Sequence, residues 1–266
     1  MSLLASVMIP RAEPGGGFEA PGPSVFEYPP IVGEITKPMV LIVVSAIVIF
    51  WFAFAAARPA AVVPGRLQFA GEFVYGAVRN SIARDSIGSE HYLKFVPYLF
   101  ALFTFVLVNN YMGLIPFIQF PSFSRSGFAY GLAALTWILY NGVGIWKHGF
   151  FGYLKHTCVP GGVKGPVLLL IVPLEFLSNI LVRPVTLALR LFANMFAGHL
   201  LLVLFAVGGQ YLLIESPSFI NAIGGLLSWV MFFGVTLLEL LIMFLQAYVF
   251  TLLTAMYVGG AVADDH

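Results

Sequence analysis

Two arginines, an asparagine and a histidine interrupt a long apolar stretch of this chain, in the run Arg183-Pro-Val-Thr-Leu-Ala-Leu-Arg190-Leu-Phe-Ala-Asn194-Met-Phe-Ala-Gly-His199. The residues around it, from Val167 to about Ile214, are mostly Leu, Ala, Phe and Val, with Arg190 at their centre. A charged side chain in hydrocarbon costs about 3 kcal/mol on insertion scales and more than ~10 kcal/mol in simulations of isolated helices. Arg190 therefore predicts a functional site, with a partner carboxylate or a water-filled cavity facing it.

The polar residues of this stretch share one face if it forms a regular helix. At about 100° per residue, they lie within roughly 60° of the direction of Arg190. This stripe comprises Glu175, Asn179, Arg183, Thr186, Arg190 and Asn194. Ala193 and Ala197 lie on the same stripe, so a neighbouring backbone can approach it closely. His199 falls on the opposite side, and we expect one helix with two functional faces.

Arg190 has no carboxylate one turn away on its own helix, and its nearest polar neighbours are neutral. Because an arginine is not deprotonated in proteins, its counter-charge must come from another helix or another subunit. Arg183 can instead snorkel to the interface or pair with Glu175 two turns back. Glu175 is then either that structural partner or a proton-accessible carboxylate. Asn179 is an accessory polar group between them.

A second apolar run, residues 219–257, carries Glu239 and Gln246 seven positions apart, on the same face of a helix. Imidazole has a reference pKa of ~6.5 and can both take and give a proton near neutral pH. His199 and Glu239 are therefore candidates for a proton relay. The alternative is that His199 makes an ordinary interhelical hydrogen bond. His199 lies about 13 Å beyond Arg190 along the helix.

Two motifs carry a family resemblance. Leu189-Arg-Leu-Phe-Ala-Asn-Met-Phe-Ala-Gly-His199, followed by Glu239-Leu-Leu-Ile-Met-Phe-Leu-Gln246-Ala-Tyr, resembles subunit a of the F-type ATP synthase, the stator of its proton channel. The detailed likeness covers about residues 173 to 257. Some relatives exchange the acid and the imidazole, and others can carry an acid where Gly113 stands. In relatives the counterpart of Glu175 usually stands one residue closer to the arginine.

The resemblance implies a non-catalytic, proton-conducting subunit with two offset half-channels. Arg190 would separate them and hold ionised a carboxylate on each subunit of a rotating c-ring. The residues implied in proton translocation are Arg190, Asn194, His199, Glu239, Gln246 and Glu175, with Arg183 and Asn179 structural or accessory. His199 and Glu239 belong to the half-channel open to the exterior. The implied partners are the c-ring, the peripheral-stalk b subunits and the lipid bilayer, with no nucleic acid and no cofactor.

Composition identifies a membrane protein. Hydrophobic residues make up 60% of the 266 positions and charged residues 9%, too few charges to build a water-soluble surface. The single cysteine, Cys158, excludes an internal disulfide and a cysteine metal cluster. His148 and His156 stand near it without a second ligand cluster, so we expect no metal site.

Hydropathy predicts an all-α polytopic fold with a polar external tail over residues 1–37 that has no fixed fold, and a single membrane domain over 38–266. The predicted spans are about 39–57, 96–115, 128–146, 167–214 and 219–257. Residues 67–84 alternate at helical spacing, with Leu67, Val74 and Ile82 on one side and Glu72 on the other. This amphipathic helix lies either at a membrane surface or partner, or packed on its own protein.

The fourth span, of about 48 residues, is too long to cross upright. As one helix it would be roughly 70 Å long against a hydrocarbon core of ~30 Å. Pro184 kinks a helix but rarely reverses it, and Gly208 comes too late to divide the run evenly. We therefore expect a single, strongly tilted helix that pairs with the last span as a hairpin.

Basic residues predict the orientation. With five spans, most fall on one side: Arg58, Arg66, Arg79, Arg84, Lys94, Lys147, Lys155 and Lys164. Arg11, Lys37 and Arg125 fall on the other. The N-terminus is then outside and the C-terminus cytoplasmic, in a bacterial plasma membrane. A secondary ion- or proton-coupled transporter is the rival function, although the paired repeats with broken helices typical of that class are not visible.

Overall fold

The computed structural model describes residues 18, 20–26, 33–57, 65–115, 118, 121–159, 167–215 and 218–263. Within these ranges every regular element is a helix, and no extended strand occurs. Five helices are long and apolar enough to cross a membrane: α1 (Lys37–Ala57), α4 (Tyr92–Met112), α5 (Ser126–His148), the continuous helix Leu168–Glu215 and α9 (Phe219–Val262). The predicted all-α polytopic fold is confirmed. The last helix continues to Val262, beyond the predicted end at 257.

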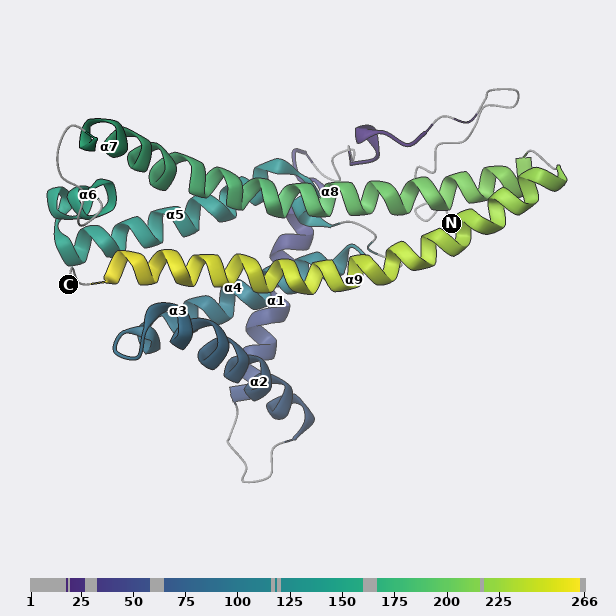
Figure 1. The fold of residues 1–266 in the computed structure, drawn as a ribbon. Coiled ribbons are helices and arrows are strands. Elements are labelled where there is room, and N and C mark those ends of the chain that lie inside the picture. Colours follow the sequence, from purple (N-terminus) through teal and green to yellow (C-terminus); the bar gives the residue numbers. More distant parts are fainter. Residues whose placement is uncertain are drawn as a thin grey trace.

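The long tilted hairpin is also present. Leu168–Glu215 is one helix of 48 residues, composed of α7 (Leu168–Phe176), the π-helical turn η4 (Leu177–Val182), α8 (Arg183–Gln210) and the π-helical η5 (Tyr211–Glu215). Figure 1 shows α8 and α9 side by side, while α1 crosses behind them instead of running alongside. A helix the length of α1 spans the hydrocarbon layer at about 1.5 Å per residue. The hairpin is therefore strongly tilted relative to α1.

The π turn η4 corrects the predicted polar stripe. A π turn closes i→i+5 hydrogen bonds and holds an extra residue, so it rotates the residues before it relative to those after it. Asn179 is consequently buried, whereas Arg190 is exposed. The prediction that both lie on one continuous face is wrong, because it assumed a constant angle per residue.

Pro184 explains how the turn is stabilised. It has no N–H, so the carbonyl groups one turn earlier lose a helical donor. Two aromatic side chains of α5 replace it: Trp137 Nε1–H donates to the Ile180 carbonyl over 2.9 Å, and the Tyr140 hydroxyl donates to the Asn179 carbonyl over 3.3 Å. Helix α5 lies between α7 and the C-terminal end of α9 at this end of the hairpin (Figure 1).

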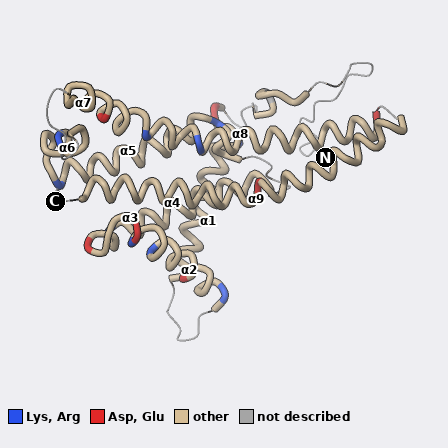
Figure 2. The backbone as a smooth tube through the Cα atoms, viewed as in Figure 1, with Lys and Arg blue, Asp and Glu red and all other residues tan. Residues whose placement is uncertain are grey.

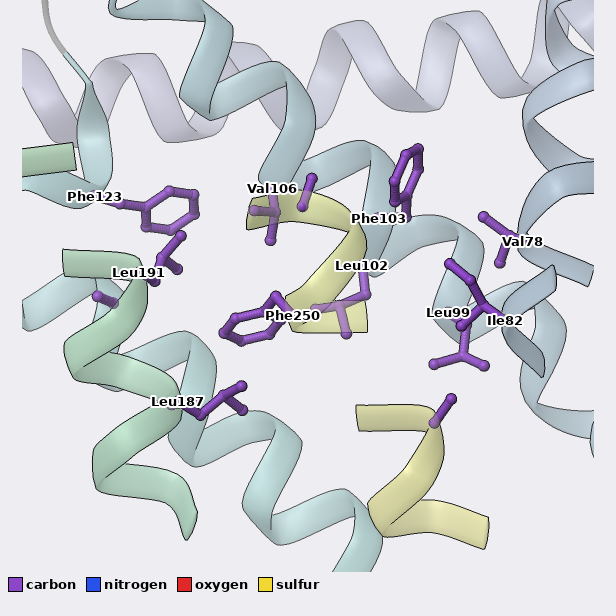
Figure 3. Packing of buried hydrophobic residues seen from close by; sticks show 14 of the residues in the cluster. Val78, Ile82, Leu99, Leu102, Phe103, Val106, Phe123, Leu187, Leu191 and Phe250 are labelled. Carbon is purple, nitrogen blue, oxygen red and sulfur yellow. The ribbon is translucent and has the colours of Figure 1, made fainter. Parts of the chain in front are cut away.

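The core lies where α4, α8 and α9 meet. Figure 3 shows Leu102, Val106 and Leu187 grouped around the ring of Phe250, which is fully buried. On α8 the buried side chains are those of Leu187, Ala188, Leu191, Met195 and Leu202, and Gly209 is also buried. Since these side chains face inward, the opposite face of α8 points away from the protein.

The amphipathic segment packs on its own chain along its second half. It comprises α2 (Arg66–Ala77), the π-helical η2 (Val78–Arg84) and α3 (Asp85–Ile87). Val78 and Ile82 are each 1% exposed within the core cluster, and a methyl group at Gly71 would lie 2.6 Å from the Ala56 side chain of α1. Phe69 and Phe73 remain exposed. Of the two predicted placements, the second half of this segment therefore takes the intramolecular one.

Part of the N-terminal tail is docked on α8. The short 3₁₀ turn η1 (Pro23–Phe26) places the Phe26 ring 4.7 Å from that of Phe196 and 5.7 Å from that of His199. The Phe18 ring lies 5.4 Å from that of Tyr211. The prediction of no fixed fold is wrong for these residues, because Phe26 is buried on α8 and Phe18 contacts it despite the surrounding Pro and Gly. Residues 1–17, 19 and 27–32 of the tail lie outside the described ranges.

Contacts between helix ends agree with five crossings. At one end, the Arg125 guanidinium donates to Thr36 Oγ1 over 3.3 Å, which brings the starts of α5 and α1 together. At the other, Lys147 Nζ donates to the Val262 carbonyl over 2.6 Å, which joins the ends of α5 and α9. Figure 2 shows Lys and Arg on α2, on the π-helical η2 that follows it and around α6 (Phe150–Cys158), while the turn between α8 and α9 carries acid and no base among the residues drawn in colour. Arg11, Arg58 and Lys164 are not described.

Candidate functional site

Arg190 stands on the outward face of α8. Its neighbours Leu187, Ala188 and Leu191 are buried in the core, while Arg190 itself is exposed. Ala193 is exposed one turn further on, and its small side chain lets a neighbouring backbone pack closely there. Across the described ranges, no carboxylate lies within ion-pair distance of this guanidinium. A counter-charge from another helix or another subunit therefore stays a prediction.

One turn beyond Arg190, two amides join α8 to α9. Asn194 Nδ2 donates to Gln246 Oε1 over 2.8 Å, and Gln246 is only 3% exposed. The Gln246 Nε2 group is buried without a partner in the described residues. The structure thus brings together two predicted site residues that stand 52 positions apart in the sequence, and it leaves an amide donor near the arginine.

Glu239 is buried against a glycine of α8. Its side chain is 3% exposed, and a methyl group at Gly198 would lie 2.8 Å from Oε1 and 3.1 Å from Cδ. A residue with a Cβ at this position would require the carboxylate to move. Neither oxygen of Glu239 has a hydrogen-bond partner among the described residues, and neither does Nδ1 of His199.

Glu239 thus packs beside the chain position next to His199, and no hydrogen bond joins its oxygens to Nδ1 of the imidazole. The carboxylate lies against Gly198, the residue that precedes the histidine. Buried polar groups normally find a partner in protein or water, and leaving one unsatisfied costs about 1–3 kcal/mol. The relay of His199 and Glu239 stays a prediction, and the unpartnered Glu239 oxygens and His199 Nδ1 can each bond to a proton-carrying group.

The third polar group is centred on Asn179. Its Nδ2 donates to Glu175 Oε2 over 3.0 Å and to the Thr157 carbonyl of α6 over 2.9 Å. Arg183 lies with its guanidinium carbon 5.1 Å from the centre of the Tyr257 ring, a cation–π distance. The predicted alternative of an Arg183–Glu175 pair is wrong, because the π turn separates the two directions.

These groups follow one another along the hairpin in a fixed order. Arg190 is fifteen residues from Glu175 and nine from His199, which corresponds to about 22 Å and 13 Å of helix. A permanent cation thus stands between two separate carboxylates, Glu175 and Glu239. Such an arrangement can pass protons to either side of the cation while preventing their direct passage between the two sides.

Sequence reasoning missed several contributors to the site. Gly198 was not singled out, although a glycine beside His199 on a packed helix signals a close contact. Trp137 and Tyr140 were not connected with Pro184, although the missing N–H of a mid-helix proline requires replacement donors. The His148 and His156 rings stack 5.2 Å apart, and within the described ranges no three metal-ligating residues are grouped closely enough to hold an ion.

Comparison with known proteins gives a consistent result. The family model described as ATP synthase A chain matches residues 39–259. The ATP synthase subunit a of a Nocardioides species is 60% identical over 280 residues, with 100% of each chain covered. The subunit a proteins of Pseudarthrobacter chlorophenolicus and Paenarthrobacter aurescens are 44% and 46% identical, each covering 96% of this chain and 97% of the relative.

Proposed function

This chain belongs to the ATP synthase subunit a family, a family of multi-pass, proton-translocating membrane subunits, and from this premise we propose how it conducts protons. It presents two offset half-channels to a rotating ring of c subunits, and Arg190 separates them. It is a stator component and carries no catalytic site of its own. Family membership leaves the rival function of secondary transporter without support.

The exposed guanidinium of Arg190 is the single observation that carries this proposal. It stands on the outward face of α8, and no ion pair joins it to Glu175 or Glu239. A cation at this depth in the membrane requires a partner, and a carboxylate on each passing ring subunit supplies one. Because arginine stays protonated, it keeps that carboxylate ionised and blocks a direct proton leak between the half-channels.

The proton route follows the order of groups on the hairpin. On the outer side, His199 and Glu239 deliver protons to the ring carboxylate. The Asn194–Gln246 bridge orients the surface next to Arg190. After nearly a full rotation, the proton leaves near Glu175 on the cytoplasmic side, where Asn179 orients the carboxylate and Arg183 acts as a structural cation on Tyr257.

The same proposal gives the chain its topology in the membrane and its partners in the complex. Residues 38–266 form the membrane domain, and the 1–37 tail is external in a bacterial plasma membrane, with the C-terminus cytoplasmic. The partners are the c-ring, the peripheral-stalk b subunits and the bilayer. Purification of the chain from its membrane should recover a rotor ring and an ATPase head with it. Recovery of the chain without these partners, after solubilisation that keeps membrane complexes together, would contradict this placement.

The decisive test is Arg190→Ala in the assembled complex. We expect loss of ATP-driven proton pumping and of ATP synthesis with assembly retained, while passive proton leak persists or rises. Arg190→Lys should also fail, since an ammonium lacks the fork geometry and can lose its proton when desolvated. Arg183→Lys, which keeps a cation beside Tyr257, is the matched control and should still pump. Coupled pumping by the alanine variant would refute the role of Arg190.

A further inference from the structure

The aromatic cover over His199 comes from the N-terminal segment. Phe26 is 5% exposed although it belongs to a short turn outside the helical hairpin. Its ring centre lies 4.7 Å from that of Phe196 and 5.7 Å from that of His199, with ring planes inclined by 34° and 56°. These distances are in the range of favourable aromatic pairs. Phe26 therefore contacts the imidazole and the preceding turn of α8 together.

The imidazole is enclosed from two directions. Gly198, the residue before it, receives the Glu239 carboxylate from α9, while Phe26 lies against the histidine ring itself. Nδ1 of His199 is buried and has no partner within the described ranges. A polar atom enclosed in this way can exchange protons only along a path that the surrounding apolar groups leave open.

A second aromatic anchor holds the same segment further along the helix. The Phe18 ring lies 5.4 Å from that of Tyr211 and is 39% exposed. Tyr211 stands twelve residues beyond His199, about 18 Å along the helix. Phe18 thus attaches the segment to α8 without touching His199. A change at Phe18 therefore tests whether docking of the segment alone matters, while a change at Phe26 also tests the contact with His199.

We propose that Phe26 is a positioning residue for proton transfer: its ring holds the His199 imidazole toward Glu239 and closes the His199 side of α8 to water at this point. This inference rests on the proposed role of His199 in the outer half-channel. Proton relay depends on the geometry of the groups involved, and a misplacement of 1 Å can cost about a hundredfold in rate. A rigid ring with few rotatable bonds is suited to that task.

The test uses two readouts in the assembled complex. Phe26→Ala should lower ATP-driven proton pumping about three- to tenfold, the size expected from loss of an aromatic pair. In a His199→Cys, Cys158→Ser background, Phe26→Ala should raise the labelling rate of position 199 by a small charged thiol reagent about tenfold, because water then reaches the site. Phe26→Leu keeps most of the apolar volume and should restore most of the pumping and the protection.

Phe18→Ala is the matched control, and it should leave both readouts at the level of the unmodified protein. Equal losses for Phe18→Ala and Phe26→Ala would overturn the inference, and so would a Phe26→Ala variant that matches the unmodified protein. If the alanine variant does not assemble, Phe26→Val, which leaves out the ring and is smaller than leucine, should still show faster labelling at position 199 than Phe26→Leu, and equal labelling rates would also count against the inference. His199→Ala is measured in parallel: retained pumping there refutes the proposed function itself, whereas lost pumping with a silent Phe26→Ala refutes only the role of Phe26.

Discussion

Asn194 of α8 donates a 2.8 Å hydrogen bond to Gln246 of α9, one helical turn from Arg190. The bond links the two long helices next to Arg190. Between Arg183 and His199, Arg190 is the one basic residue of α8. Because Gln246 is buried, its side-chain position is determined by packing. The bridge therefore fixes the distance between α8 and α9 beside the arginine.

Breaking this bridge should impair coupled proton transport. A buried hydrogen bond contributes about 0.5–1.5 kcal/mol net, and an unsatisfied partner costs more. Asn194→Ala and Gln246→Ala should each lower ATP-driven acidification of vesicles several-fold, and the double variant should be little worse than the worse single. Leu245→Ala, at an exposed neighbouring position, is the control and should pump normally. Fully multiplicative losses would show that the two amides act independently.

A side chain at Gly198 should disturb the position of Glu239. A methyl group there would meet Glu239 Oε1 at 2.8 Å, closer than such contacts allow, so Gly198→Ala must displace the carboxylate. We expect strongly reduced proton pumping with the complex still assembled. Glu239→Asp shortens the acid by one methylene and should recover part of the activity when combined with Gly198→Ala. Gly234→Ala is the matched control, since open space surrounds Gly234 on α9; the same defect in both glycine variants would contradict this explanation.

The sequence allows the helices and the main polar residues to be predicted because both signals are local. Apolar runs of the right length predict spans, and a charge within such a run is conspicuous at once. Arg190, His199 and Glu239 could therefore be identified before their positions were known. The 48-residue length of the fourth run similarly predicted a tilted helix.

The parts that could not be predicted depend on contacts between distant segments. The π turn at residues 177–182 precedes Pro184, and Trp137 and Tyr140 of another helix donate to the carbonyls of Ile180 and Asn179 within it. Because of this turn, the predictions of a continuous polar stripe and of an Arg183–Glu175 pair were both wrong. Phe26 was likewise hidden in a Pro- and Gly-rich tail, because its burial depends on a surface of α8 that no local pattern reveals.

The donors at the π turn should contribute to stability. Trp137→Phe removes the N–H that reaches the Ile180 carbonyl, and the unsatisfied carbonyl costs about 1–3 kcal/mol. We expect a lower thermal midpoint of the purified complex and a smaller yield. Trp146→Phe on the same helix is the control, because Trp146 is 87% exposed. Equal midpoints for the two variants would exclude the proposed role of the Trp137 donor.

Cysteine labelling should establish the orientation. Single cysteines at Ser126 and Ser89, both exposed, are introduced after Cys158→Ser. An impermeant thiol reagent should label position 126 from outside and position 89 only from inside, as the distribution of basic residues predicts. Cysteines at Ser24 and Ser216 should also react from outside. Labelling of positions 89 and 126 from the same side would be incompatible with five crossings.

The natural thiol can report on Glu175. Cys158 lies in α6 and is 4% exposed; burial raises its pKa above the ordinary value, and the negative charge of Glu175 raises that pKa further. The thiolate is the reactive form, so at a fixed pH near 8 alkylation should be slow and should accelerate only above the usual thiol range.

Glu175→Gln removes the charge and keeps the shape of the side chain. The pKa of Cys158 should then fall toward its ordinary value, and the labelling rate at pH 8 should rise, while the plateau rate at high pH, set by access to the buried sulfur, should change little. Glu215→Gln, at the far end of the same long helix, is the control and should leave the whole pH profile of labelling unchanged. A Glu175→Gln profile that coincides with that of the unmodified protein would mean that Glu175 does not carry its charge beside α6.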